Sequence, residues 1–302
     1  MQLADGAWQS GESLAEVAGI SRAAIHKRVQ KLRDAGWPIE AEAGHGYRLP
    51  GGWDRLDAQR LQAQAPPDWQ VTVLDQTAGT NAWLASQAYA GPRLVLAEQQ
   101  TAGRGRRGRQ WHSPPGVNLY ASVDWQFDCA SSQLGPLGLV VAQSLLSAID
   151  LPGVGIKWPN DLVAEGQKLA GILIEASGEL AGPVRVIIGM GCNVWMRAGP
   201  ELDQPWTSLV QLGWQGSRTG LANRLMARLN EDLPRFAEQG FAPFLAGYQQ
   251  RDVLQDQPVT VDEGGRLTAG VARGVDLSGR LQCEINGQLV ALASGDVSVR
   301  RQ

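Results

Sequence analysis

The first fifty residues contain two short helix signals separated by a tight turn. Leu14 and Val17 lie three residues apart after Ser10, as on the buried face of a helix. Gly19-Ile20-Ser21 then turns the chain, and the Ser21 hydroxyl is placed to cap a second helix over residues 22–35. Alternating segments joined by Gly44-His45-Gly46 predict a β-hairpin. This succession is the outline of a winged helix-turn-helix domain over residues 1–50.

The second helix carries most of the positive charge of this domain. Residues 1–50 hold six basic and six acidic side chains, but Asp34 is the only acid on the second helix. A basic helix of this kind suits the major groove of DNA, and the alternative is a solvated face of an ordinary surface helix. The residues expected at the DNA are Ser21, Arg22, Ala23, His26, Lys27, Arg28 and Lys31.

Composition excludes several other classes of protein. The chain has 302 residues, 43% of them hydrophobic, and a net charge of -3, which predicts two or three folded domains. No apolar run approaches the roughly 18 residues of a membrane span, so no membrane association is expected. The three cysteines and three histidines are scattered without metal-ligand or disulfide spacing. These features predict a reduced, cytoplasmic protein.

The rest of the chain divides into three parts. Residues 51–68 form a linker around a short polar helix, residues 69–254 mix strands and helices, and residues 255–302 contain only strand signals, with Asn286-Gly287 as a hairpin turn. The fold class is therefore α+β and multidomain. The expected strands in the mixed part are Val71–Leu74, Leu94–Ala97, Val117–Trp125, Leu169–Glu175 and Val184–Cys192, and the expected helices are Ser132–Ile149 and Thr219–Glu238, the second kinked at Pro234.

A glycine- and arginine-rich run, Gly103–Arg109, follows the second of these strands. It matches G-x-G-x-x-G, but Pro114 and Pro115 prevent the helix that a dinucleotide site needs after this motif. The run has three glycines and four arginines, with no acidic residue between Glu98 and Asp124. We expect a loop that stays mobile until a carboxylate or phosphate orders it. The alternatives are an RNA-binding arginine–glycine patch and a merely solvated loop.

Two further segments carry candidate site residues. The turn Lys157-Trp158-Pro159-Asn160-Asp161 brings a lysine and an aspartate close together, or is simply a tight turn. Lys168 begins an apolar strand in which Gly171 leaves room for a ligand against the sheet, although a lysine at a strand entrance is usually just exposed. A later strand is interrupted in the same way by Gly189, Gly191 and Asn193.

Together these segments could activate a carboxylic acid as an acyl-adenylate. Arginines and a lysine would hold a carboxylate beside a triphosphate, and the glycine-containing strands would hold a flat apolar ligand. No serine or cysteine with an adjacent base is apparent, so the chemistry is expected to rely on positioning and charge.

The order and spacing of Gly103–Gly108, Lys157–Asp161 and Lys168–Glu175 resemble the bifunctional biotin–protein ligases that also repress the biotin operon. Ser21-Arg22-Ala23-Ala24-Ile25 resembles the helix-turn-helix of that family, and the similarity extends from Ser10 to Arg300. The resemblance implies a winged helix-turn-helix, a central α/β ligase domain over residues 69–254, and a C-terminal SH3-like β-barrel over residues 255–302.

The resemblance also implies a two-step reaction with ATP and Mg²⁺. Biotin becomes biotinyl-5′-AMP, and the biotinyl group then passes to a lysine of the biotin carboxyl carrier subunit of acetyl-CoA carboxylase. Biotinyl-5′-AMP would act as corepressor by promoting a homodimer that binds operator DNA. Arg104, Arg106 and Lys168 would serve catalysis, and Asp161 is the candidate acceptor for the proton of the carrier lysine.

The family match assigns the ligand contacts residue by residue. The expected biotin contacts are Gly79, Thr80, Asn81, Gln100, Gly103, Arg104, Gly105, Arg106, Trp111, Lys168, Gly171, Leu173 and Gly189. The expected ATP contacts are Arg104, Arg106, Arg107, Lys157, Asn160, Lys168, Asn193 and Trp206. The residues that would hold Mg²⁺ are not assigned.

Two departures from the family pattern affect these expectations. Ala78-Gly79 stands where the family has Asp-Ser before Thr80-Asn81, so the serine hydroxyl that would meet the biotin ring is missing. Met1-Gln2-Leu3-Ala4 keeps only the end of the helix that packs beneath the helix-turn-helix, which predicts a domain of marginal stability or a start codon assigned too far downstream. The alternatives are a ligase with a non-functional winged helix, a lipoate–protein ligase, and a transcription factor with a decayed ligand domain.

Overall fold

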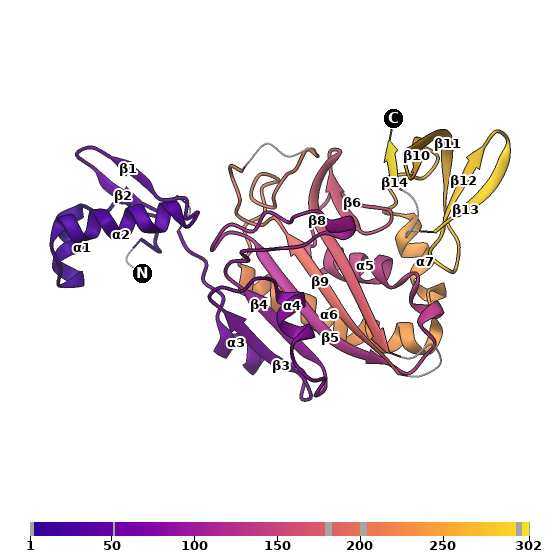
Figure 1. Ribbon diagram of the computed structural model, residues 1–302, viewed down its shortest axis with the longest axis horizontal. Helices are drawn as coiled ribbons and strands as arrows, with labels where there is room; N and C mark the ends of the chain where they lie inside the picture. Colours follow the sequence, from indigo (N-terminus) through magenta and orange to yellow (C-terminus); the bar gives the residue numbers. More distant parts are fainter. Residues whose placement is uncertain (1–2, 51, 179–182, 200–203, 294–297, 302) are drawn as a thin grey trace.

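The computed structural model describes residues 3–50, 52–178, 183–199, 204–293 and 298–301. Its strands form sheets of two, seven and five strands, one after another along the chain. Figure 1 shows the small N-terminal part at one end of an elongated molecule, the seven-stranded sheet in the middle and the five-stranded sheet at the other end. The three patterns in the sequence therefore correspond to three successive parts of the structure.

The N-terminal part has the expected helix–turn–helix–hairpin order: α1 (Gly11–Ala18), α2 (Arg22–Asp34), β1 (Glu40–Glu42) and β2 (Gly46–Arg48). The Ser21 hydroxyl accepts a hydrogen bond of 3.2 Å from the backbone N–H of Ala24, as a helix cap should. The small core contains Leu3, Leu14, Ile25, Val29, Ile39 and Leu49. Val17 does not join it: its side chain is 71% exposed, and the sequence was wrong to place it on the buried face.

The seven-stranded sheet has the order β3-β4-β5-β9-β8-β7-β6, and only β3 and β4 run parallel. Figure 1 shows α4 (Thr80–Ala85) on the near side of this sheet and α5 and α6 behind it. The strands are β3 (Gln70–Leu74), β4 (Arg93–Ala97), β5 (Leu119–Phe127), β6 (Val154–Lys157), β7 (Asp161–Ala164), β8 (Gln167–Gly178) and β9 (Val184–Cys192). All five expected strands are confirmed, with the third starting at Leu119 rather than at residue 117.

The two core helices differ from expectation in one respect. The first is not continuous over residues 132–149, because a 3₁₀ turn (Ser131–Leu134) is separated by Gly135-Pro136 from α5 (Leu137–Ile149). The second, α6 (Arg218–Gln239), continues through Pro234. In the part of the chain that the structure describes, Ser131–Ile149 alone has the length and apolar composition of a membrane-crossing segment, and 61% of its apolar window is buried inside the protein.

The C-terminal part is strand-rich, as expected. Its antiparallel sheet has the order β13-β12-β11-β10-β14, and Asn286-Gly287 makes the turn between β12 and β13 with both φ angles positive. Buried Val259 and Leu281 belong to the same apolar core as the seven-stranded sheet. The remaining elements are α3 (Ala58–Ala63) in the linker, α7 (Ala242–Gln249), β10 (Pro258–Glu263), β11 (Arg266–Val275), β12 (Leu281–Ile285), β13 (Gln288–Leu292) and β14 (Ser298–Arg301).

Candidate active site

Small residues form the floor of the site on one face of the seven-stranded sheet. Gly189 on β9 pairs with Ser122 on β5 and with Leu173 on β8. Two residues further along β9, Gly191 pairs with Gly171 on β8. Because side chains alternate between the two faces of a sheet, these positions share one face, and its three glycines leave gaps between the neighbouring side chains.

The first gap in this floor is filled by α4. A Cβ atom at Gly189 would lie 2.4 Å from Oδ1 of Asn81, so glycine is required for α4 to approach. Ser122 Oγ lies 2.6 Å from Oγ1 of Thr80 and 2.6 Å from Oδ1 of Asn81. Gly79 caps α4 without a side chain, and Gln100 Oε1 takes that place by accepting a 2.9 Å hydrogen bond from the backbone N–H of Thr80.

The second gap is filled by Trp111. A Cβ atom at Gly191 would lie 2.5 Å from the indole, and one at Gly171 would lie 3.1 Å from it. The sequence suggested that these glycines leave room for a ligand, whereas in this structure the protein's own indole occupies that room. The indole Nε1 is buried and has no hydrogen-bond partner among the described residues. An unsatisfied buried donor is costly, so an acceptor that reached this N–H would stabilise the site.

Lys168 and Asp161 form an ion pair beside Trp111. Lys168 Nζ lies 2.7 Å from Oδ1 of Asp161, and the two side chains are only 22% and 15% exposed. The β7–β8 hairpin brings them together, since Asp161 begins β7 and Lys168 lies at the start of β8. Lys168 Nζ also lies 5.5 Å from the centre of the Trp111 ring, within range of a cation–π contact.

The Gly103–Arg109 loop lies against the same hairpin. Arg106 donates a hydrogen bond of 3.3 Å to Oδ1 of Asn160, whose amide in turn donates to the backbone carbonyl of Ile172 at 2.7 Å. Desolvation, followed by the nearby charge of Arg107, lowers the pKa of Arg106 from its ordinary value. Both effects disfavour the charged form of the guanidinium, and an anion bound here would offset them.

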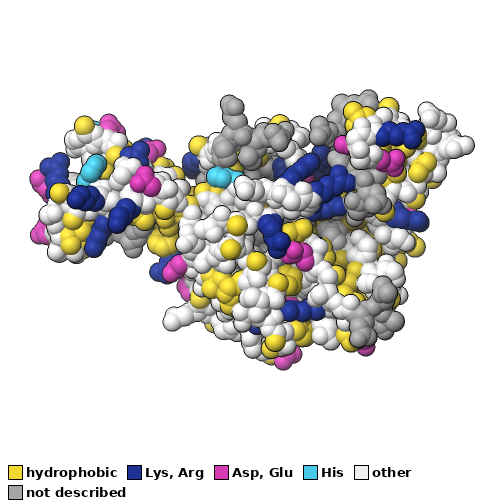
Figure 2. Space-filling view, viewed as in Figure 1, with side chains coloured by type: hydrophobic (Ala, Val, Ile, Leu, Met, Phe, Trp, Pro, Cys, Tyr) yellow, Lys and Arg dark blue, Asp and Glu magenta, His cyan; other side chains and the backbone are white. Residues whose placement is uncertain are grey.

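The backbone of this loop agrees with the analysis of its motif. Only a three-residue 3₁₀ turn, Arg106–Gly108, forms, and no helix follows in residues 109–118. Gly103 is needed because a Cβ there would lie 2.7 Å from the backbone carbonyl oxygen of Trp111. In Figure 2, Lys and Arg side chains gather close to the C-terminal part of the molecule, in the region where Figure 1 places this loop.

Comparison with known proteins agrees with this geometry. Residues 72–193 match the biotin/lipoate A/B protein ligase family, and residues 3–48 match a helix-turn-helix domain. A bifunctional ligase/repressor BirA from Salmonella typhimurium is 38% identical over 99% of this chain and 95% of its own length. The chain belongs to the BirA family. The BirA of Escherichia coli is 36% identical over the same shares of the two chains.

A solved structure supports the assignment of the ligase part. The biotin protein ligase from Aquifex aeolicus in complex with biotin and ATP has a TM-score of 0.67 and 27% identity, and it covers 77% of this chain and 99% of its own. The fold class that the sequence predicted is confirmed: a helix-turn-helix domain precedes a ligase domain and a strand-rich C-terminal part.

Several residues predicted to contact a ligand have partners within this BirA-family chain. Asn193 is buried, and its amide donates to the backbone carbonyl of Thr207 at 2.9 Å. Trp206 forms an isolated bridge with Lys168 and packs against Gly199. Lys157 pairs in register with Asp161 across the β6–β7 turn. The remaining predicted positions, Gly105, Arg107 and Leu173, are half-buried or exposed around the loop and the sheet floor.

Two residues that the sequence did not single out join the site. Ser122 is fully buried beneath α4, and Glu175 on β8 contacts both Asn81 and Arg104. Glu175 was visible in the sequence as the end of an apolar strand that carries Lys168 and Gly171. Period-two alternation places it on the same face as Gly171, which is the signal that could have identified it.

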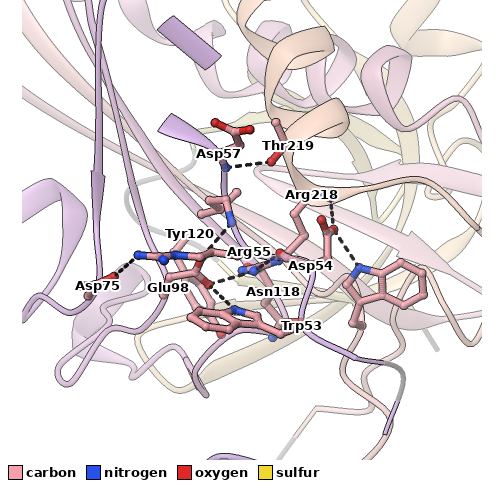
Figure 3. A network of polar contacts seen from close by, with 12 residues as sticks. Trp53, Asp54, Arg55, Asp57, Asp75, Glu98, Asn118, Tyr120, Arg218 and Thr219 are labelled. Carbon is pink, nitrogen blue, oxygen red and sulfur yellow. Dashed lines mark hydrogen bonds and ion pairs between the residues drawn. The ribbon is translucent and has the colours of Figure 1, made fainter. Parts of the chain in front are cut away.

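A buried arginine fastens the linker to the ligase domain (Figure 3). Arg218, at the start of α6, is fully buried and lies 2.8 Å from Oε2 of Glu98, which follows β4. Its Nε donates to the backbone carbonyl of Asp54 at 2.9 Å, and Glu98 Oε1 accepts from the backbone N–H of Leu56 at 2.8 Å. A buried ion pair with its remaining donors and acceptors satisfied fixes a unique arrangement of the linker.

The predicted DNA-contacting residues all lie at the surface. Ile25 and Val29 turn inward from α2. Exposed side chains are found at Ser21, Arg22, Ala23, His26, Lys27, Arg28 and Lys31. Figure 2 shows several Lys and Arg side chains over this part of the molecule. The surface of α2 is thus free for a partner.

Proposed function

We propose that this chain adenylates biotin with ATP and transfers the biotinyl group to a lysine of the biotin carboxyl carrier subunit of acetyl-CoA carboxylase. The supporting observation is that three separate sequence segments meet at one place. Trp111 lies against Gly171 and Gly191, Lys168 lies beside its ring, and Arg106 reaches Asn160 next to Asp161. Cations, an apolar platform and a buried unpaired donor are therefore assembled on one face of the sheet.

The first step needs charge stabilisation rather than a protein nucleophile. A biotin carboxylate oxygen attacks the α-phosphorus of ATP, and pyrophosphate leaves. Arg104, Arg106 and Lys168 would hold the carboxylate and phosphate oxygens together and offset the charge that develops between them. The buried N–H of Trp111 would donate to an oxygen of the same group.

Mg²⁺ would enter with the nucleotide. Among the residues with a described position, no group of three or more His, Cys, Asp or Glu side chains is arranged to hold a metal ion. Asp161, a carboxylate beside the predicted phosphate contact Lys168, is paired with that lysine. The ATP phosphates themselves would therefore supply most of the oxygen ligands that Mg²⁺ prefers.

In the second step, the amine of the carrier lysine attacks the acyl carbon, and AMP leaves. A lysine with a pKa near 10.4 is only about 0.1% neutral at pH 7.4, so a proton acceptor or desolvation is needed. Asp161 is our candidate acceptor. The test is streptavidin detection of a carrier domain incubated with the chain, ATP and biotin: labelling must require all three and must disappear when the target lysine is replaced by arginine.

We further propose that the N-terminal domain binds operator DNA as part of a biotinyl-5′-AMP-dependent homodimer in the cytoplasm. The exposed basic face of α2 supports this proposal. Its test is a titration with operator DNA with and without biotin and ATP. Affinity must rise with both ligands and fall with salt by about 0.9 log unit per log unit of salt for each phosphate neutralised. An affinity for operator DNA that does not change with biotin and ATP would overturn the corepressor role.

We retain as domain boundaries residues 1–50, 51–68, 69–254 and 255–302. The separate apolar core of the N-terminal part supports the first boundary. The shared core of the other two parts means that the C-terminal sheet would depend on the ligase domain for its stability.

A further inference from the structure

Glu175 joins the two ends of the predicted ligand site through its two carboxylate oxygens. Oε2 accepts a hydrogen bond of 2.7 Å from Nδ2 of Asn81, and Oε1 lies 3.2 Å from NH2 of Arg104. Asn81 is a predicted contact of biotin, and Arg104 a predicted contact of its carboxylate. The Glu175 side chain is 38% exposed, so it is partly shielded by its surroundings.

The contact with Glu175 determines whether the NH₂ group or the oxygen of the Asn81 amide faces the carboxylate. Ser122 lies 2.6 Å from Oδ1 of Asn81, but a hydroxyl can donate or accept and would tolerate either orientation. An ionised carboxylate only accepts, so Glu175 requires the NH₂ group of Asn81 on its side. Asn81 is then left with one N–H to offer a ligand, and this selects a ligand carbonyl oxygen over a ligand donor.

Close packing fixes where the Asn81 amide lies. Asn81 is 8% exposed and is pressed against Gly189, where a Cβ would lie 2.4 Å from Oδ1. The amide cannot withdraw without losing the contact with Ser122. The position of the amide thus follows from packing, and its hydrogen-bonding sense follows from Glu175.

We propose that Glu175 is a positioning residue that makes Asn81 a hydrogen-bond donor toward the carbonyl of the biotin ring and draws Arg104 toward the sheet. This inference rests on the proposed function. Loss of one hydrogen bond to the ligand corresponds to about a tenfold loss of affinity. Glu175→Ala should therefore raise the KM for biotin about tenfold while kcat falls less than threefold.

The conservative variant separates this role from a merely structural one. Glu175→Gln keeps an acceptor oxygen for Asn81 but can also donate, so it should restore the KM for biotin only in part, to a value between those of the original chain and Glu175→Ala. The effect of Glu175→Ala should also largely disappear in an Asn81→Ala background, because the two changes remove the same interaction. Glu231→Ala is the matched control: its carboxylate lies 3.2 Å from NH1 of Arg228 in an exposed pair on α6, and its loss should leave the KM unchanged.

The experiment measures biotin-dependent ATP–pyrophosphate exchange by the full chain and these variants, with thermal unfolding as a check of folding. The expected result is a raised KM in Glu175→Ala, partial rescue by Glu175→Gln and non-additivity with Asn81→Ala. A folded Glu175→Ala variant with unchanged KM, or one in which only kcat falls, overturns the inference while the proposed function stands. No exchange by the original chain overturns both.

Discussion

The side-chain amide of Gln99 donates a hydrogen bond of 3.1 Å to the backbone carbonyl of Ala35. Ala35 ends the helix that carries the predicted DNA contacts, and Gln99 precedes Gln100, which caps α4 in the candidate site. Beside this contact, the rings of Trp37 and Trp53 meet edge to face at 5.0 Å. The N-terminal domain is therefore docked on a segment that also frames the predicted biotin pocket.

Gly116 is the position at which this docking is most sensitive to substitution. Its φ is +75°, and a Cβ there would lie 2.8 Å from the Trp37 ring. Gly116→Ala should lower the free energy of unfolding by about 2–3 kcal/mol, because the backbone is strained and Trp37 is displaced. It should also increase proteolysis within residues 51–68. Gly213→Ala is the control, since its φ is +83° with no atom within 4 Å, and should cost only about 1 kcal/mol. Equal losses of unfolding free energy in the two variants, measured by urea unfolding, would contradict the packing role of Trp37.

The two glycines under Trp111 should differ in their tolerance of a methyl group. Gly191→Ala places Cβ 2.5 Å from the rigid indole, whereas Gly171→Ala places it 3.1 Å from the indole and 3.2 Å from the flexible end of Lys168. We expect Gly191→Ala to lower the adenylation rate at least tenfold and Gly171→Ala to have a smaller effect, because only the first must displace the ring. Pyrophosphate exchange measures the adenylation rate of both variants. A larger loss of rate in Gly171→Ala would be evidence against the Trp111 indole as the platform of the site.

The ion pair between Lys168 and Asp161 changes what we expect of Asp161→Asn. If Asp161 acted only as the acceptor for the proton of the carrier lysine, this variant would damage transfer more than adenylation. Since Asp161 lies 2.7 Å from Nζ of Lys168, we expect it also to hold that ammonium in place in both steps. Asp161→Asn should slow adenylation by a factor of about 10–100 and transfer at least as much, and Lys168→Ala should abolish adenylation. Single-turnover measurement of each step decides: loss of transfer alone would show that Asp161 acts only as the proton acceptor.

Stability should depend on the protonation of Asp252. Burial raises the pKa of this carboxyl from 3.8 to about 6. The folded chain therefore binds the proton more readily than the unfolded chain, so stability falls as the pH rises from about 4 to about 6 and is then constant. Asp252→Asn should be more stable than the original chain above pH 6, by about 1–3 kcal/mol, and the difference should vanish below pH 4. Urea unfolding at several pH values tests this, and a difference that does not vary with pH would show that Asp252 is not the titrating group.

Local patterns in the sequence were sufficient for most of the fold. Ser10 and Ser21 cap their helices, and the turn at Asn286-Gly287 forms as its residues require. Val17 was misplaced because helical spacing alone does not show which side of a two-turn helix finds a partner. The interruption at Gly135-Pro136 was overlooked because the apolar periodicity continues on both sides of it.

The site was predictable as a set of residues but not as a set of contacts. Arg106, Asn160, Asp161, Lys168 and Trp111 do meet, which the spacing of their motifs could not show. That Gly189 and Gly191 accommodate Asn81 and Trp111 depends on how α4 and the loop pack on the sheet. The Arg218–Glu98 pair joins residues 120 positions apart, and no local pattern signals such a partner.

ATP–pyrophosphate exchange by the purified chain, with biotin, lipoate or no acid, tests the central claim most directly. We predict exchange that requires biotin, because the Arg104–Arg106 loop, Lys168 and the Trp111 platform are assembled at one site. Exchange supported by lipoate instead would keep the adenylation chemistry but contradict the substrate. Absence of exchange with every acid, from protein shown to be folded, would contradict the assignment of this site as a ligase active site.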